Sequence, residues 1–242
     1  MTQYLQQDDR ITEARYKMSA LEKNILYLLM RELDEQDPPG KQYIVDLATL
    51  EQIVGPLTRE AITKATDNLI SRDFEIKEDE NTTLIASLMT VVLRDFSAKK
   101  LYIKISQNIL PYFVALKKDY TEFELHVALS LRHKYSKRLY EMLSQHKEAG
   151  ELHISIQELK RRLKLNKDDK HGELYTQFAT FRRSILEVAQ EELAEHADIH
   201  FTYEAIKTGK KYTDLTFYIE QIDPLSHKNG LMLESKKHQK IN

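Results

Sequence analysis

Eight basic side chains fall within residues 160–183, against three acidic ones, so this stretch carries a net charge of +5. They are Lys160, Arg161, Arg162, Lys164, Lys167, Lys170, Arg182 and Arg183. Lysine and arginine bind phosphate oxygens, and arginine also pairs with guanine edges. Residues 1–123 carry 16 Lys and Arg against 20 Asp and Glu, and the whole chain has a net charge of −2. A local basic face on a near-neutral chain indicates a nucleic-acid surface.

Residues that could perform covalent or metal chemistry lack the partners that such chemistry needs. The chain has no cysteine, which excludes thiol nucleophiles, disulfides and cysteine-based zinc sites. It has no phosphate-binding glycine loop, no His-Glu-x-x-His and no His-hydrophobic-His motif, so none of its 13 tyrosines has an evident activator. His196 and His200 straddle a helix end and a strand, and Glu75 to Glu80 is expected to be a solvated acidic turn. We therefore expect no catalytic site, no metal site and no cofactor.

The basic stretch is predicted to lie on a helix-turn-helix. Ser155-Ile156-Gln157-Glu158 is a capping box that starts a short helix. A polar turn over 167–172 precedes a longer helix over 174–193, whose apolar stripe is Phe178, Phe181, Ile185, Val188 and Ala189. The opposite face carries Thr176, Ala179, Thr180 and Arg183, with Arg182 on its flank. Such an order is typical of a DNA-reading motif.

An alternating pattern follows this motif and predicts a β-hairpin. Ile199, Phe201 and Tyr203 are expected on one face of the first strand. Leu215, Phe217 and Ile219 are expected on the same face of the second strand. Gly209 supplies the turn, and the tip carries Lys207, Lys210 and Lys211. A long helix over about 122–148, ended by Gly150, and a short strand at His153-Ile154 precede the motif.

The first half of the chain predicts the same order of elements. After a polar arm over 1–15, a Ser19 capping box starts a helix to about residue 33, and Tyr43 to Val45 form a strand. Helices are expected over 46–54 and 58–71, and strands over 83–93 and 100–105. The expected fold class is α+β, with two tandem winged-helix domains. They occupy residues 1–120, including a connecting segment at 106–120, and residues 121–222, followed by a flexible tail at 223–242.

Composition places the chain among intracellular proteins. Charged residues make up 31% and hydrophobic residues 41% of the 242 positions, and no apolar run is long enough to cross a bilayer. The N-terminus does not resemble a signal peptide. We expect a cytoplasmic protein with no membrane partner.

The run from Leu129 to Leu143 (LSLRHKYSKRLYEML) resembles the signature helix of iteron-binding plasmid replication initiators, the RepB/RepE-like initiator replication protein family. Further matches occur in family order: Ala14-Arg15-Tyr16 with the Ser19 helix, Leu110-Pro111-Tyr112 with Leu116-Lys117, Phe178 to Leu186, and Tyr203 to Lys211. The resemblance covers nearly all of residues 14–222. Lys137 departs from it, since the family more often has an apolar or small residue there.

The resemblance implies a protein that binds directly repeated double-stranded origin DNA as a monomer and helps to open the origin. It also implies recruitment of host replication proteins, such as the initiator and helicase, and repression of its own gene as a dimer. The second domain would read DNA, whereas the first would mediate dimerisation and auxiliary DNA contact. A two-domain transcriptional repressor is the alternative, and a nuclease or relaxase is a third possibility.

The basic side chains are expected to divide the work of DNA binding. Thr180 and Arg183 are best placed for base edges. Phosphate contacts are assigned to Lys160, Arg161, Arg162 and Arg182. Lys164 and Thr176 complete the expected surface, and the wing lysines 207, 210 and 211 would contact phosphate or the minor groove. For Arg138 two roles stay open, DNA contact or an ion pair with Glu141.

Overall fold

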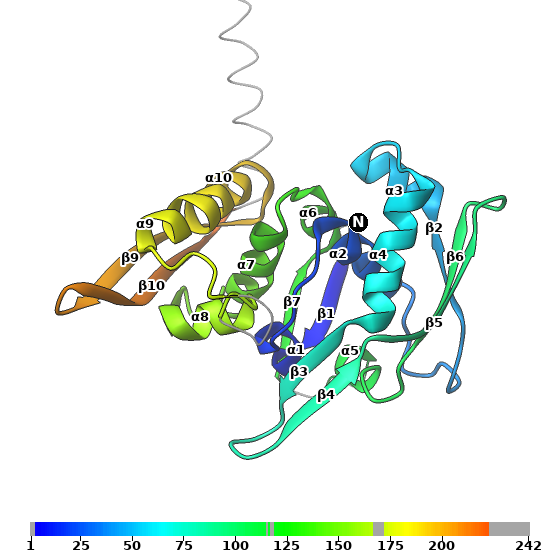
Figure 1. The fold of residues 1–242 in the computed structure, drawn as a ribbon, viewed down its shortest axis with the longest axis horizontal. Helices are drawn as coiled ribbons and strands as arrows, with labels where there is room; N and C mark the ends of the chain where they lie inside the picture. The colour runs from blue at the N-terminus through cyan, green and yellow to red at the C-terminus, as the bar shows by residue number, and fades with distance from the viewer. Residues whose placement is uncertain (1–2, 115, 117–118, 167–171, 223–242) are drawn as a thin grey trace, which may run out of the picture.

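The computed structural model describes residues 3–114, 116, 119–166 and 172–222. Two units of mixed helix and strand lie side by side in it, the N-terminal one at right and the C-terminal one at left in Figure 1. The expected tail at 223–242, the turn at 167–171 and residues 115, 117 and 118 of the connecting segment lie outside the described residues.

The first winged helix contains the predicted helices and the predicted strands over 43–45 and 100–105. Its elements are α2 (Ala20–Met30), β2 (Tyr43–Asp46), α3 (Leu47–Val54), α4 (Arg59–Ser71), β5 (Met89–Asp95) and β6 (Lys100–Ile105). Strand order is β2-β6-β5, with antiparallel pairing throughout. The capping box is confirmed, because the Ser19 hydroxyl accepts the Glu22 amide and the Glu22 carboxylate accepts the Ser19 amide.

The prediction of one strand over 83–93 was wrong. Strand β4 (Thr83–Ser87) pairs with β3 (Asp73–Lys77), whereas β5 belongs to the other sheet. The chain changes sheets at Leu88, whose backbone bonds Arg72 and Ser106. The prediction of a solvated acidic turn from Glu75 to Glu80 was also wrong in part. The start of that stretch belongs to β3, in which Phe74 and Ile76 are completely buried.

The prediction of a polar arm over residues 1–15 was wrong as well. Strand β1 (Tyr4–Asp8) and helix α1 (Asp9–Glu13) form there, and β1 pairs with β7 (Tyr120–Glu124). Leu5 and Gln7 point inward, and Gln7 is tolerated because its amide bonds the Thr12 hydroxyl at 2.9 Å. The connecting segment contains a short helix, α5 (Pro111–Val114).

The long helix expected over 122–148 is two helices, α6 (Leu125–Ser130) and α7 (Lys134–Gln145). Two charged side chains, Lys137 of α7 and the distant Glu192, stabilise the break between them. Lys137 donates to the carbonyls of Ala128 and Leu129 at the end of α6. Glu192 accepts the amides of Arg132 and His133, which start α7, at 3.1 to 3.2 Å.

The C-terminal part of the chain contains α7, β8 (Glu151–Ser155), α8 (Ile156–Arg162), a broken helix over residues 178–196, β9 (Ile199–Thr208) and β10 (Lys211–Gln221). Its strands lie in the order β8-β10-β9. The predicted domain boundary at residue 120, with a different role for each domain, stays a prediction. Strand β7, just beyond that position, pairs with β1, so the two parts of the chain share buried structure there.

Candidate nucleic-acid interface

The helix predicted over 174–193, which we call the recognition helix, begins later than the sequence predicts. Leu174 is exposed, and Tyr175 adopts a left-handed backbone with φ 53°, so the helix starts at α9 (Phe178–Phe181). It continues as a π-helical turn, η1 (Arg182–Leu186), and ends with α10 (Glu187–His196). Phe181, Ile185 and Ala189 are buried as predicted. Thr176 is exposed but precedes the helix.

The outer face of this helix carries the polar and basic side chains expected of a DNA reader. Thr180, Arg182 and Arg183 are all exposed. Arg182 Nε lies 3.0 Å from Glu187 Oε1. Among the residues that the structure describes, Arg183 has no hydrogen bond or ion pair. Its guanidinium is therefore available for a ligand.

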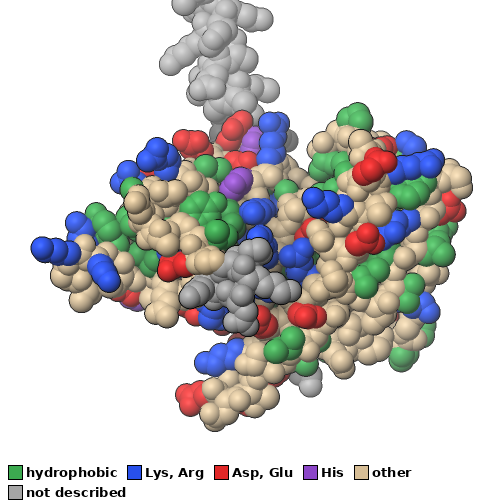
Figure 2. Space-filling view, in the orientation of Figure 1, with side chains coloured by type: hydrophobic (Ala, Val, Ile, Leu, Met, Phe, Trp, Pro, Cys, Tyr) green, Lys and Arg blue, Asp and Glu red, His purple; other side chains and the backbone are tan. Residues whose placement is uncertain are grey.

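The wing presents a second basic group beside the recognition helix. Lys207, Lys210 and Lys211 are exposed around a two-residue turn in which Gly209 has φ 64°. Figure 2 shows Lys and Arg side chains around the tip of β9–β10, at the left end of the molecule. Thr208 and Thr213 bond each other across the hairpin at 3.0 Å, which fixes the tip.

An aromatic stack joins the wing to the start of the recognition helix. The rings of Phe178 and Tyr212 lie 4.2 Å apart and nearly parallel, and Lys207 Nζ lies 4.5 Å from the Tyr212 ring centre. A groove of about 680 Å³ runs between α8, α9 and β10 beside this stack, and Gln157 and Lys211 are among its lining residues. Helix and wing thus form one surface with a fixed spacing.

The basic side chains of α8 are bonded to acceptors of the protein itself. Lys160 is 8% exposed and donates to Glu173 and to the Tyr175 carbonyl at 2.7 and 2.8 Å. Arg161 and Arg162 both bond the Glu158 carboxylate at 2.7 to 2.8 Å. These ion pairs were predictable from the sequence, because Glu158 lies three and four residues before the two arginines, a spacing that brings side chains together on a helix.

The two arginines also tie α8 to the N-terminal unit. Arg161 donates to the Glu13 carbonyl at 3.2 Å, and Arg162, which is 12% exposed, lies 3.4 Å from the Glu13 carboxylate. Lys164 differs from them: it is half-exposed at the end of α8, with φ 53°. Of the α8 cations, Lys164 is the one whose position suits a phosphate.

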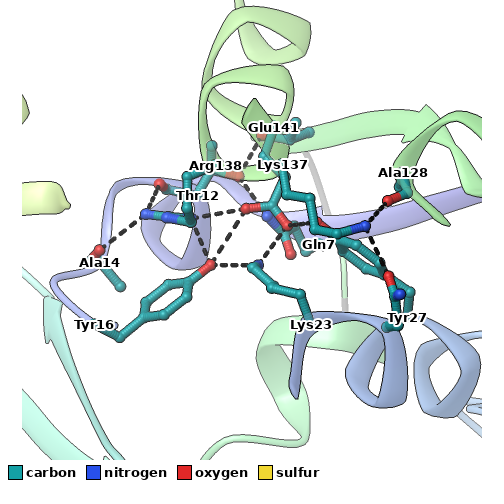
Figure 3. Close-up of polar contacts among 12 residues, drawn as sticks. Gln7, Thr12, Ala14, Tyr16, Lys23, Tyr27, Ala128, Lys137, Arg138 and Glu141 are labelled. Atoms are coloured by element: carbon teal, nitrogen blue, oxygen red, sulfur yellow. Dashed lines mark hydrogen bonds and ion pairs between the residues drawn. The ribbon is translucent and has the colours of Figure 1, made fainter. Parts of the chain in front are cut away.

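A buried polar cluster positions α7 against the N-terminal unit (Figure 3). The Glu141 carboxylate accepts from Lys23 Nζ at 2.5 Å, from Arg138 Nη1 at 2.8 Å and from the Tyr27 hydroxyl at 2.8 Å. Arg138 also donates to the Tyr16 hydroxyl and to two backbone carbonyls of the chain before α2. Of its two open roles, Arg138 therefore has the ion pair with Glu141, and its burial removes it from DNA.

This cluster, which we call the Glu141 node (Tyr16, Lys23, Tyr27, Arg138 and Glu141), is completely buried. Burial alone would raise the pKa of Glu141, but the nearby cations lower it overall. Burial lowers the pKa of Lys23 to about 8, against the pull of Glu141. The node is charged, and each of its five members is hydrogen-bonded, although Arg138 Nε has no partner among the described residues. These bonds hold α7, from which the second winged helix extends.

Lys137 lies next to the Glu141 node and is equally buried. Its ammonium donates to Asn24 at 2.7 Å and to the α6 carbonyls. Burial and, to a smaller extent, the neighbouring charge of Lys23 together lower the pKa of Lys137 to about 7. At the position where it departs from the family, the chain therefore places a helix-capping cation inside the core.

The corresponding helix of the first unit, α4, has a face of mixed charge. Arg59 and Lys64 are exposed there beside Glu60 and Asp67, and Arg94 of β5 pairs with Asp67. This face lacks the excess of cations that the second unit has. It is suited at most to a supporting DNA contact.

The described residues contain no cluster of three or more His, Asp or Glu side chains that could hold a metal ion. His196 lies beside Glu195 and His200 beside Glu220, so the two histidines do not meet at one site. Within the same described ranges, no helix is both long and apolar enough to span a membrane.

Comparison with known proteins matches both units. The family model described as "Initiator Replication protein, WH1" matches residues 4–144, and "Initiator Rep protein, WH2" matches residues 155–219. The "PI protein" of Escherichia coli is 25% identical over 233 residues, covering 81% of this chain and 75% of that protein. A "Replication initiation protein" of Escherichia coli is 26% identical over 175 residues, covering 69% of this chain and 49% of that protein.

A solved structure shares the fold. It is the crystal structure of Pi initiator protein in complex with iteron DNA, with a TM-score of 0.75 and 19% identity. The match covers 91% of this chain and 98% of that one. With both winged-helix models matched in order, the chain belongs to the initiator replication protein family.

Proposed function

We propose that this protein initiates plasmid replication by binding directly repeated double-stranded DNA at an origin, that is, iterons. The observation that carries the proposal is the set of exposed basic side chains on the recognition helix (Arg182 and Arg183) and on the wing (the three lysines), in a chain of the initiator family. The related Pi initiator was solved with iteron DNA, which supports the same ligand for this chain.

We assign base reading to Thr180 and Arg183, because both are exposed on the helix and Arg183 has no partner among the described residues. Arg182 and the three wing lysines are assigned to phosphates. Lys164 and Thr176, at the two ends of the turn between the helices, are peripheral contacts. We remove Lys160, Arg161 and Arg162 from the contacting set, because their donors already bond protein acceptors.

We further propose that the N-terminal unit mediates self-association and auxiliary DNA contact. On the outer face of its sheet, Ile44 and Leu93 flank Tyr102 across three strands, and Leu93 is 54% exposed. An apolar stripe of this kind is suited to burial against a second copy. Opening of the origin, recruitment of host replication proteins and repression of its own gene as a dimer complete the proposed activity.

The experiment is selection of bound duplexes from a random-sequence library with the full chain, followed by titration of the recovered motif. We expect one asymmetric motif, bound by one protomer per copy when copies are placed in tandem. A palindromic motif bound only by dimers would favour the transcriptional repressor instead. Nicking of the same duplexes in magnesium or manganese would favour a nuclease.

A further inference from the structure

The π-helical turn in the recognition helix decides which arginine meets a carboxylate. Glu187 follows Arg183 by four residues, the spacing at which an α-helix brings such side chains together. In the structure, Glu187 instead pairs with Arg182, five residues before it, at 3.0 Å. Such π-helical turns are rare in proteins overall, and those that occur are often found at functional sites. Here the turn transfers the ion pair from one arginine to its neighbour.

The pair lies on the exposed face of the recognition helix. The side chains of Arg182 and Glu187 are 51% and 41% exposed, so neither belongs to the core. Glu187 binds Arg182 through Nε, and the terminal nitrogens of Arg182 have no partner among the described residues.

We infer that Glu187 is a specificity-determining residue that holds Arg182 in one orientation and leaves Arg183 free for base edges. This inference rests on the proposed function. An arginine that can turn freely finds a phosphate on any duplex, whereas an arginine held by a carboxylate fits only a backbone at the right place. The carboxylate also repels a misplaced phosphate, and repulsion of wrong partners is a common source of specificity.

The chain offers a matched control for this inference. Glu191 is exposed on α10, one turn beyond Glu187, and has no ion pair with any residue that the structure describes. The variants Glu187→Gln and Glu191→Gln therefore remove the same charge from the same helix. They differ in whether Arg182 loses its partner.

The test measures the binding of full-length variants to two duplexes by fluorescence anisotropy at one salt concentration. One duplex is the motif that the wild type recovers from the random library, and the other is a shuffled duplex of equal composition. Glu187→Gln is expected to lower the ratio of the two affinities by about fivefold or more, because the freed Arg182 would then also bind the phosphates of the shuffled duplex. Glu191→Gln should leave the ratio unchanged. In an Arg182→Ala background, Glu187→Gln should have no further effect on the ratio.

An unchanged ratio in Glu187→Gln would overturn the inference, and so would an equal fall in Glu191→Gln. Both outcomes leave the wild-type preference for the recovered motif intact, and with it the proposed function. If the wild type recovers no preferred motif at all, the proposed function fails and the inference fails with it.

Discussion

Replacing Glu141 with glutamine should destabilise the protein more than any surface charge change. The carboxylate is the one acid of the Glu141 node, and it faces Lys23 at 2.5 Å and Arg138 at 2.8 Å. Glutamine keeps the volume and one acceptor, but it removes the negative charge and turns an amide donor toward two cations. Breaking a buried ion pair by removing one partner costs about 3–5 kcal/mol. We expect a loss in the unfolding free energy of that order.

The assay is urea unfolding followed by circular dichroism at pH 7, with Glu191→Gln as the control. That control removes an exposed carboxylate that has no ion pair among the described residues, so its expected cost is below about 0.5 kcal/mol. A loss below about 1 kcal/mol in Glu141→Gln would refute the reasoning, because it would mean that Lys23 and Arg138 do not depend on this carboxylate.

Three further predictions concern the wing, the buried lysine and the N-terminal sheet. Replacing Lys207, Lys210 and Lys211 with alanine should lower the slope of log K against log salt by up to roughly 2.7, at about 0.9 for each phosphate contact; an unchanged slope would mean that the wing stays in solvent. The lowered pKa of Lys137, about 7, makes the unfolded chain bind more protons between pH 7 and pH 9, so stability should rise with pH in that window. Lys137→Met should remove about 2 kcal/mol of that rise in urea unfolding, and an equal rise in both proteins would contradict the assignment. Leu93→Glu should convert a dimer to a monomer in sedimentation without loss of DNA binding, and a variant that still dimerises would place the interface elsewhere.

Much of the fold was predictable from the sequence, because local signals and the global arrangement agree. The Ser19 capping box and the Gly209 turn both form where expected. The break between α6 and α7 was not predictable, since it depends on Lys137 and on Glu192, which lies about 60 residues away. Strand β1 was missed because Gln7 occupies an inward position that an apolar residue would have marked.

For the candidate interface, the sequence predicted which exposed residues carry the positive charge better than it predicted which cations are bonded within the protein. Arg182, Arg183 and the wing lysines are exposed, as the helical and hairpin patterns require. The basic side chains of α8 were assigned to DNA on their charge alone. Their carboxylate partners include Glu13, which comes close only when the two units pack together.

The central claim is that the outer face of the recognition helix reads base sequence, and Arg183→Ala tests it most directly. The full chain and the variant are titrated with the recovered motif and with a shuffled duplex under the same conditions. A lost base contact should reduce the discrimination between the two duplexes by about 1–3 kcal/mol while leaving the affinity for shuffled DNA nearly unchanged. An equal loss of affinity for both duplexes would contradict the account, because Arg183 would then bind backbone and not bases.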